Sequence, residues 1–298
     1  MGGVKCYYEP ESVQELAELC SIFYAKGEDF DLIGHTSNTL FTEDYHCERM
    51  ISTRKLNHFE FRDDAIECEC GTSVRQLSLQ AIELGVKGFE GLIDLPGTVA
   101  SAIYGHATCY GCDLSGLLLD ATLLQHDGSI VTVTPGWFAF AERSSALKRK
   151  EKQGIILYLR LRREPADSTE LKRIADNNHQ IRRTSQPEAK NSLGSIFFDE
   201  GKPTLLNRTL SAITKLYGIM LGLSGQSEER INLKRRHLTF TLLGALDIEP
   251  YVRNWNWYQW SDVRSHKLFW KYVRIHKRLF TKSDFEIEIK HNRNFKFP

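Results

Sequence analysis

The chain has 298 residues, of which 41% are hydrophobic, 26% charged and 11% aromatic; this composition excludes an intrinsically disordered protein, and the length predicts two domains. No apolar run approaches the roughly twenty residues that span a bilayer, and seven cysteines without a regular framework indicate a reduced, cytoplasmic protein with no membrane partner. The formal net charge is +1, but residues 231–298 contain 14 Lys and Arg against 6 Asp and Glu, which fits either a phosphate-bearing partner or a solvated basic face.

The first half of the chain predicts two capped helices and a series of strands. A helix over residues 12–27 begins at a capping box of Ser12 and Glu15, repeats apolar residues at helical spacing, and ends at Gly27. A second helix, over residues 73–85, has the same design. Alternating or apolar runs predict strands at residues 30–33, 65–70, 121–125, 130–134 and 155–162.

The second half begins at a polar stretch, residues 163–170, that contains Pro165 and indicates a domain boundary. Beyond it we expect a helix near residues 170–182, then a mixed segment up to Pro250. A final helix over residues 262–280 has an apolar face of Leu268, Tyr272, Ile275 and Leu279. Helices and strands do not alternate regularly, which favours an α+β fold over a doubly wound sheet.

The stretch DLPGTVASAIYGHATCYG, residues 94–111, carries almost no charge and is rich in small side chains. Pro96, Gly97 and Thr98 form a turn followed by a helix N-cap, after which Val99 and Ala102 bury one face of a short helix together with Ile103. One interpretation is a tightly packed helix entry. The other is a cradle in which free backbone N–H groups at the helix start bind a phosphate.

Six segments, in order along nearly the whole chain, resemble motifs of the UDP-N-acetylenolpyruvoylglucosamine reductase family. LIGHTSNTLF resembles that family's LGGGSNLL loop, and LPGTVASAIYGHATCYG resembles its IPGTVGGAVRMNAGAYG. The other four segments are ERSSALK, QPEAKNSLGSIFFDEG, RHLTF and FEIEI. The segment between Leu205 and Lys234 matches poorly.

The resemblance implies an α+β fold with a two-lobed FAD-binding domain of the PCMH or vanillyl-alcohol-oxidase type over residues 1–165. A smaller α+β substrate-binding domain would follow over residues 166–298. Two loops would close on the FAD, consistent with the need of a pyrophosphate for backbone donors and of a flat ring for small neighbours. The residues implied are Gly34, His35, Thr36, Ser37 and Asn38 in the first loop, and Pro96, Gly97, Thr98, Ser101, Ala102, Gly105, His106, Ala107, Tyr110 and Gly111 in the second.

The same resemblance implies a reaction in which NADPH reduces the flavin and hydride then passes to the β-carbon of an enolpyruvyl nucleotide sugar. Ser195 would donate the proton to the α-carbon, and Arg143 and Glu288 would stabilise or orient the enolate. We expect no metal, no nucleic-acid partner, and a monomer or small homo-oligomer.

Several residues depart from the family pattern. His35 and Thr36 replace glycines in the first loop, and His106 and Thr108 replace an asparagine and a glycine in the second. Each side chain costs about 1 kcal/mol or more wherever the loop requires a positive φ. Phe198-Asp199-Glu200 stands where the family has Lys-Asn-Pro. The loss of a cation and the gain of two acids should weaken binding of the family's usual substrate.

Three alternatives remain open from the residues. A repurposed or non-catalytic flavoprotein would bind cofactor and sugar nucleotide without turnover. The basic final helix and the NWNWYQW segment would suit single-stranded nucleic acid, although Trp255, Trp257 and Trp260 fit better as core anchors. Cys109 and Cys112 match C-x-x-C, but their neighbours belong to the second flavin loop.

Overall fold

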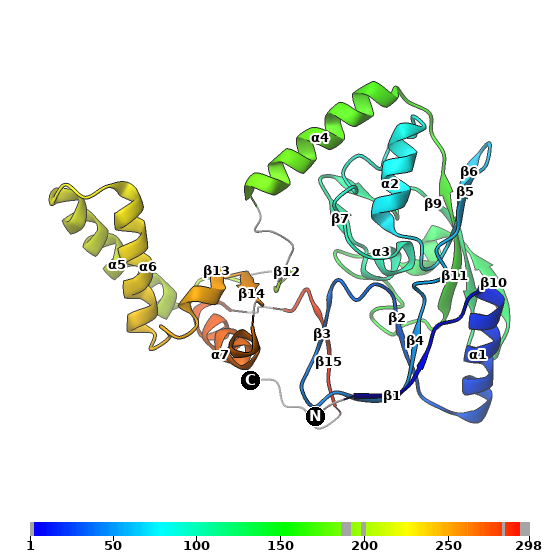
Figure 1. Cartoon of the computed structure of the whole chain (residues 1–298), viewed down its shortest axis with the longest axis horizontal. Coiled ribbons are helices and arrows are strands. Elements are labelled where there is room, and N and C mark those ends of the chain that lie inside the picture. Colours follow the sequence, from blue (N-terminus) through cyan, green and yellow to red (C-terminus); the bar gives the residue numbers. More distant parts are fainter. Residues whose placement is uncertain (1–2, 186–191, 198–200, 261, 282–283, 293–298) are drawn as a thin grey trace. The chain divides into compact units, whose positions relative to one another are not determined.

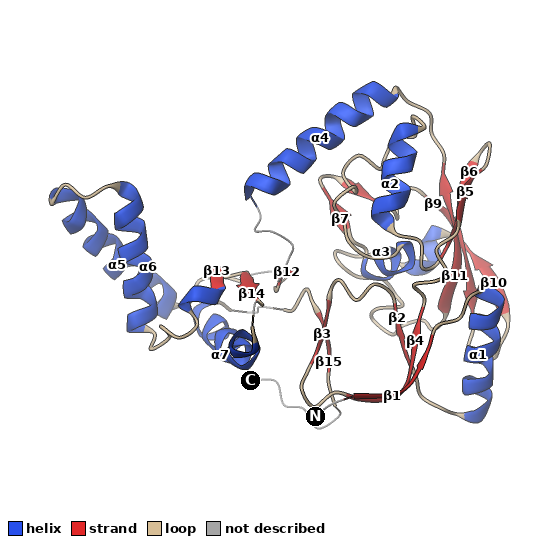
Figure 2. Ribbon diagram, viewed as in Figure 1, coloured by secondary structure: helices blue, strands red, loops and turns tan. Residues whose placement is uncertain are grey.

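The structure is a computed structural model that describes residues 3–185, 192–197, 201–260, 262–281 and 284–292. The chain forms two compact units. Unit 1 comprises Met1–Ser37, Phe41–Gln186 and Lys290–Asn292, and unit 2 comprises Asn38–Leu40, Pro187–Ile289 and Arg293–Pro298. Helices and strands are present in both units (Figures 1 and 2), so the predicted α+β class is confirmed.

Unit 1 contains two main sheets (Figure 2). The first is parallel, in the order β1-β4-β2, and the second is antiparallel, in the order β10-β9-β11-β6-β5. The antiparallel strands β7 and β8 form a separate short hairpin. The strand bounds are β1 Gly3–Tyr8, β2 Asp31–Ile33, β3 Thr39–Phe41, β4 His46–Ser52, β5 Phe59–Phe61, β6 Ala65–Glu69, β7 Thr108–Cys109, β8 Cys112–Asp113, β9 Leu118–Leu124, β10 Ile130–Val133 and β11 Ile155–Arg162.

The helices of unit 1 begin and end at the residues that the capping signals predict. Helix α1, Val13–Lys26, has Ser12 as N-cap and ends at Gly27 with φ 64°. Ser73 caps α2, Val74–Glu83, by accepting from the backbone of Gln76. The remaining helices of this unit are α3 Val99–Gly105, α4 Ser168–Ser185 and the 3-10 helix η1 Pro135–Phe138. Helices α1, α2 and α3 are confirmed because their capping signals are local, and α4 covers the helix predicted near residues 170–182.

Unit 1 extends beyond the boundary that the sequence predicts after residue 165. The polar stretch is tied back to the end of α2, because Glu164 O accepts from Lys87 N and Gly85 O accepts from Ala166 N. Helix α4 then buries Leu171 and Ala175 in the core of the antiparallel sheet. The helix therefore belongs to unit 1, and the division between the units falls at residues 186 and 187.

Unit 2 has its own apolar core, built around α7. Its elements are β12 Ser192–Ser195, α5 Leu205–Leu223, α6 Glu228–Leu242, the 3-10 helix η2 Glu249–Tyr251, β13 Val252–Asn254, β14 Trp257–Gln259, α7 Val263–Leu279 and β15 Glu288–Lys290. The strands form a sheet in the order β12-β14-β13, while β15 pairs with β3. The predicted apolar face of α7 is confirmed: Tyr272, Ile275 and Leu279 are buried, and Leu268 packs against the core. Trp255 and Trp260 also pack against this core, as expected of anchors.

The segment predicted as mixed contains the two helices α5 and α6, which run side by side as a hairpin (Figure 1). Helix α5 is not evident from the sequence, because it contains glycines and glycine weakens isolated helices. Gly218 is required by packing: a Cβ there would lie 2.6 Å from Cδ of Arg235 on α6. Among the described residues, no helix combines the length and the apolar character needed to cross a membrane.

His276 of α7 is fully buried, and neither of its ring nitrogens has a hydrogen-bond partner among the residues that the structure describes. The ring stacks on Phe197 with centroids 3.7 Å apart and on Phe280 at 4.7 Å. Burial in this apolar stack lowers the pKa of His276 to about 4. The imidazole is therefore neutral in the folded protein at neutral pH.

This stack predicts acid sensitivity. Because the unfolded chain binds the proton near pH 6.5 and the folded chain only near pH 4, unfolding becomes easier as pH falls through this window. At pH 4.5, His276 should lower the free energy of unfolding by about 2 to 3 kcal/mol relative to pH 7.5. Urea titrations of wild type and His276→Phe measure the difference. Equal acid losses in both proteins would contradict this role of His276.

Candidate functional site

The first predicted loop follows β2 and contains a residue with strained backbone. Thr36 has φ 56°, in the left-handed region that a side chain disfavours. The Arg54 guanidinium steadies this loop: its Nη2 donates to His35 O at 3.1 Å and to Thr36 Oγ1 at 3.5 Å. Burial, and then the charge of Arg54, lower the pKa of His35. Arg54, two residues after the end of β4, thus supports the loop. No motif in the sequence indicates this role.

The second predicted loop lies against the first through two glycines. A Cβ on Gly34 would be 3.0 Å from Thr98 Oγ1, and a Cβ on Gly97 would be 3.2 Å from Ser37 Oγ. Gly97 also has φ 114°, which L side chains rarely adopt. The structure therefore brings the two loops into contact within unit 1, and both glycines are needed for this close approach.

The entry of α3 is a packed helix start rather than a free phosphate cradle. Thr98 and Ser101 form a capping box in which each side chain accepts from the other's backbone N–H. The next N–H groups donate to distant carbonyls, Val99 N to Thr72 O and Ala100 N to Cys70 O. The first N–H groups of α3 are already bonded, so the expectation of free donors here is wrong.

Free backbone donors occur instead in the first loop. Within the described part of the chain, no hydrogen-bond acceptor is recorded for the backbone N–H groups of His35, Thr36 and Ser37. Successive N–H groups beside a left-handed residue form an anion-binding concavity. Asn38, the last predicted residue of this loop, belongs to unit 2, where its side-chain amide donates to Glu286 O.

The far end of the second loop is shaped by positive φ values at side-chain-bearing residues. His106 ends α3 with φ 46°, and its Nδ1 lies 2.6 Å from Ala141 O. Tyr110 and Gly111 have φ 45° and 76° and form the two-residue turn between β7 and β8. The strain expected from replacing the family's asparagine with His106 is therefore present. The hydrogen bond to Ala141 offsets part of it.

Arg143 lies beside this second loop. Its Nη1 donates to Thr108 O at 3.4 Å, and its backbone has φ 52°. Lys148 Nζ donates to Arg143 O at 2.9 Å and so holds this unusual backbone in place. Ser145, from the same segment, donates to Tyr104 O at 2.6 Å. The ERSSALK segment is thereby fixed to α3, and Lys148, the last residue of this segment, supports the backbone of Arg143.

Ser195 and Glu288 lie in unit 2, on segments that run next to each other. Ser195 ends β12 opposite Trp257 and is half-buried. The following residue, Ile196, accepts at its carbonyl from Glu286 N at 2.9 Å, which places this strand beside the one bearing Glu288. Glu288 is half-buried, and its N–H donates to Asn38 O.

Asn256, between β13 and β14, fixes the backbone after Ser195. Its Oδ1 accepts from Phe197 N at 2.7 Å, and its Nδ2 donates to Phe197 O at 2.9 Å. The sequence signalled this segment only by its tryptophans. Residues Phe198-Asp199-Glu200, where the sequence departs most from the family, lie outside the described residues.

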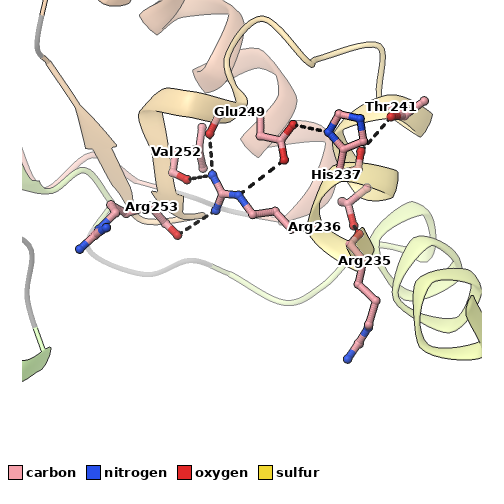
Figure 3. A network of polar contacts seen from close by, with 8 residues as sticks. Arg235, Arg236, His237, Thr241, Glu249, Val252 and Arg253 are labelled. Atoms are coloured by element: carbon pink, nitrogen blue, oxygen red, sulfur yellow. Dashed lines mark hydrogen bonds and ion pairs between the residues drawn. The ribbon is translucent and has the colours of Figure 1, made fainter. Parts of the chain in front are cut away.

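The RHLTF segment lies on α6, and its arginine is structural (Figure 3). Arg236 donates to the carbonyls of Glu249, Val252 and Arg253, and His237 Nδ1 lies 2.9 Å from Glu249 Oε2. Burial lowers the pKa of Arg236, and the carboxylate of Glu249, 3.7 Å from Nε, opposes this shift. The Arg236 guanidinium links α6 to the turn that follows it. Its charge is therefore not available to bind a phosphate-bearing ligand.

Comparison with known proteins agrees with this geometry. The family described as FAD binding domain matches residues 4–134. A UDP-N-acetylenolpyruvoylglucosamine reductase from Caldicellulosiruptor saccharolyticus is 31% identical over 190 residues, covering 63% of this chain and 61% of the relative. The chain is therefore similar to UDP-N-acetylenolpyruvoylglucosamine reductases, and its first half matches the FAD binding domain.

Further reductases of this name match in the same way. The protein of that name from Bacillus subtilis is 28% identical over 189 residues, 63% of this chain and 62% of its own length. The chain thus spans about three fifths of the length of these curated relatives. The crystal structure of the Thermus caldophilus reductase has a TM-score of 0.66 at 20% identity, over 95% of this chain and 91% of that one, and shares its fold.

The residues of unit 1 fit the FAD implied by the reductase family. Gly34 lies against Thr98, so the two loops are adjacent, and the unbonded donors of the first loop suit the pyrophosphate of FAD. A Cβ on Gly105 or on Gly111 would meet nothing within 4 Å, so this end of the second loop is open. The contacts of the individual residues of the two loops to FAD stay predictions.

Proposed function

We propose that this chain is a cytoplasmic FAD-dependent reductase that takes hydride from NADPH and delivers it to an enolpyruvyl nucleotide sugar. The observation that carries the proposal is the contact of two glycine-bearing loops, with open N–H donors, inside a domain that matches FAD binding domains. The family relatives are named as reductases of this substrate class, which supports the same activity here.

Bound FAD would supply acceptance of hydride from NADPH and its donation to the β-carbon of the substrate. The chain's own residues would then manage the charge that develops on the α-carbon. Arg143 presents a planar fork of donors suited to the substrate carboxylate, and Lys148 holds its backbone. Ser195 would transfer its hydroxyl proton to the α-carbon, and Glu288 would orient the acid and the enolate.

Ser195 is well placed for such a task within unit 2. Its strand is anchored on both sides, by Asn256 through Phe197 and by Glu286 through Ile196. Proton transfer requires a donor held close to its acceptor, and these contacts fix the backbone that follows Ser195. Glu288, on the segment that follows Glu286, would take part in restoring the serine proton from solvent.

Anaerobic half-reactions test this function. NADPH should bleach the flavin absorbance, and an enolpyruvyl nucleotide sugar should restore it under the same conditions. Bleaching without reoxidation by any enolpyruvyl or nucleotide-sugar candidate would instead identify a flavoprotein that no longer turns over.

Arg143→Lys should retain flavin bleaching by NADPH but slow reoxidation by substrate about tenfold or more. A single ammonium cannot reproduce the two parallel donors of the guanidinium. Stopped-flow absorbance separates the two steps. Arg173→Lys serves as the control, because that arginine is exposed on α4 and pairs with Glu170. Normal reoxidation by Arg143→Lys would remove the role assigned to Arg143.

A further inference from the structure

Helix α5 of unit 2 exposes a continuous apolar stripe that the proposed reaction does not use. The opposite side of the helix buries Leu210, Thr214 and Gly218 against the rest of the unit. On the open side, four large side chains are 64–86% exposed. Spaced at three, four and seven residues, the stripe consists of Leu205, Ala212, Ile213, Leu216, Ile219, Met220 and Leu223.

Basic residues border this stripe, and acidic residues are absent from α5. Arg208 and Lys215 are both exposed and lie seven residues apart, two helical turns along the same edge of the stripe. Arg278, also exposed, lies beside the helix start, where Arg278 O accepts from Thr204 Oγ1. The sequence from Leu205 to Leu223 contains no Asp or Glu.

This charge pattern identifies the kind of surface that fits the stripe. A second copy packed on the same face would offer no carboxylate from its own α5 to Arg208 and Lys215. In an antiparallel pair, the two basic edges would meet and repel. An anionic lipid surface supplies both an apolar interior for the stripe and negative headgroups for its edge. The helix is amphipathic and does not reach the character of a spanning segment.

We propose that the α5 stripe docks on an anionic phospholipid membrane, with the helix lying in the plane of the interface. The proposal does not depend on the flavin reaction. It revises the expectation of no membrane partner, which rested on the lack of an apolar run long enough to span a bilayer. Of the basic residues that border the stripe, Arg278 belongs to the surplus over residues 231–298.

Flotation of the full chain with vesicles tests the proposal. The protein should float with phosphatidylcholine vesicles that contain about one third phosphatidylglycerol, and high salt should reduce this binding. It should bind pure phosphatidylcholine vesicles much more weakly. Leu216→Glu combined with Met220→Glu should lower the fraction of protein bound to vesicles at least tenfold. Arg208→Glu combined with Lys215→Glu should lower that fraction by a similar factor, but for anionic vesicles only.

Ile130→Glu on β10 is the matched control, because Ile130 is an exposed apolar residue of unit 1. It should float as wild type does, and circular dichroism should show that every variant is folded. Absence of flotation at low salt would overturn the proposal, as would equal binding by Leu216→Glu/Met220→Glu. Sedimentation equilibrium without lipid supplies the competing outcome: a dimer that becomes monomeric in the double variant would assign the stripe to a second copy instead.

Discussion

Replacing Ser195 with alanine should leave reduction of the flavin by NADPH unchanged and slow its reoxidation by substrate about a thousandfold or more. The first half-reaction involves no proton transfer to the substrate, whereas the second places a negative charge on the α-carbon. A serine hydroxyl is a weak acid, but it can protonate a strongly basic carbon when it is held close. The contacts of Asn256 and Glu286 to the residues that follow Ser195 provide that restraint.

Rapid-mixing absorbance measures the two steps separately, with each half-reaction started from one oxidation state. Ser211→Ala is the matched control, since the hydroxyl of Ser211 on α5 donates only to the neighbouring Asn207 among the contacts described. It should behave as wild type in both steps. Equal damage by Ser195→Ala to both half-reactions would show that the serine supports the fold or the cofactor instead of the proton transfer.

Gly34→Val should weaken FAD binding about a hundredfold while the domain remains folded. A Cβ at this position would lie 3.0 Å from Thr98 Oγ1 and 3.1 Å from Thr98 Cγ2, so the branched side chain must push the two loops apart. Thr98 cannot move away easily, because it is buried and caps α3. The open donors of the first loop would then lose their position relative to the second loop.

Fluorescence titration of the apoprotein with FAD measures this loss. Gly136→Ala in η1 is the control, since a Cβ there meets nothing within 4 Å and its φ is not positive. The control should bind FAD as wild type does, and thermal unfolding should show both variants folded. Wild-type affinity in Gly34→Val would mean that contact between the loops is unnecessary for the cofactor.

Local signals in the sequence were sufficient for much of unit 1. Ser12, Ser73 and Thr98 cap the helices that they predict, because a capping side chain bonds within three residues of itself. Spacing alone also located the buried face of α7. Neither kind of signal depends on how distant segments meet.

The features that the sequence did not reveal depend on distant contacts. The donors at the start of α3 are taken by carbonyls of Thr72 and Cys70, more than twenty residues earlier, so their availability could not be judged from the loop itself. Arg54 reaches the first loop across nineteen positions. Helix α5 was not predicted because it contains glycines. The requirement for Gly218 follows from its packing against Arg235 of α6, a contact that the sequence does not reveal.

We propose that the two contacting loops of unit 1 hold FAD. The most direct test is to incubate the purified, folded chain with FAD, remove free cofactor by gel filtration, and record the visible spectrum before and after denaturation. We expect a yellow protein that retains about one equivalent of FAD. A chain that is folded by circular dichroism and emerges colourless would contradict it.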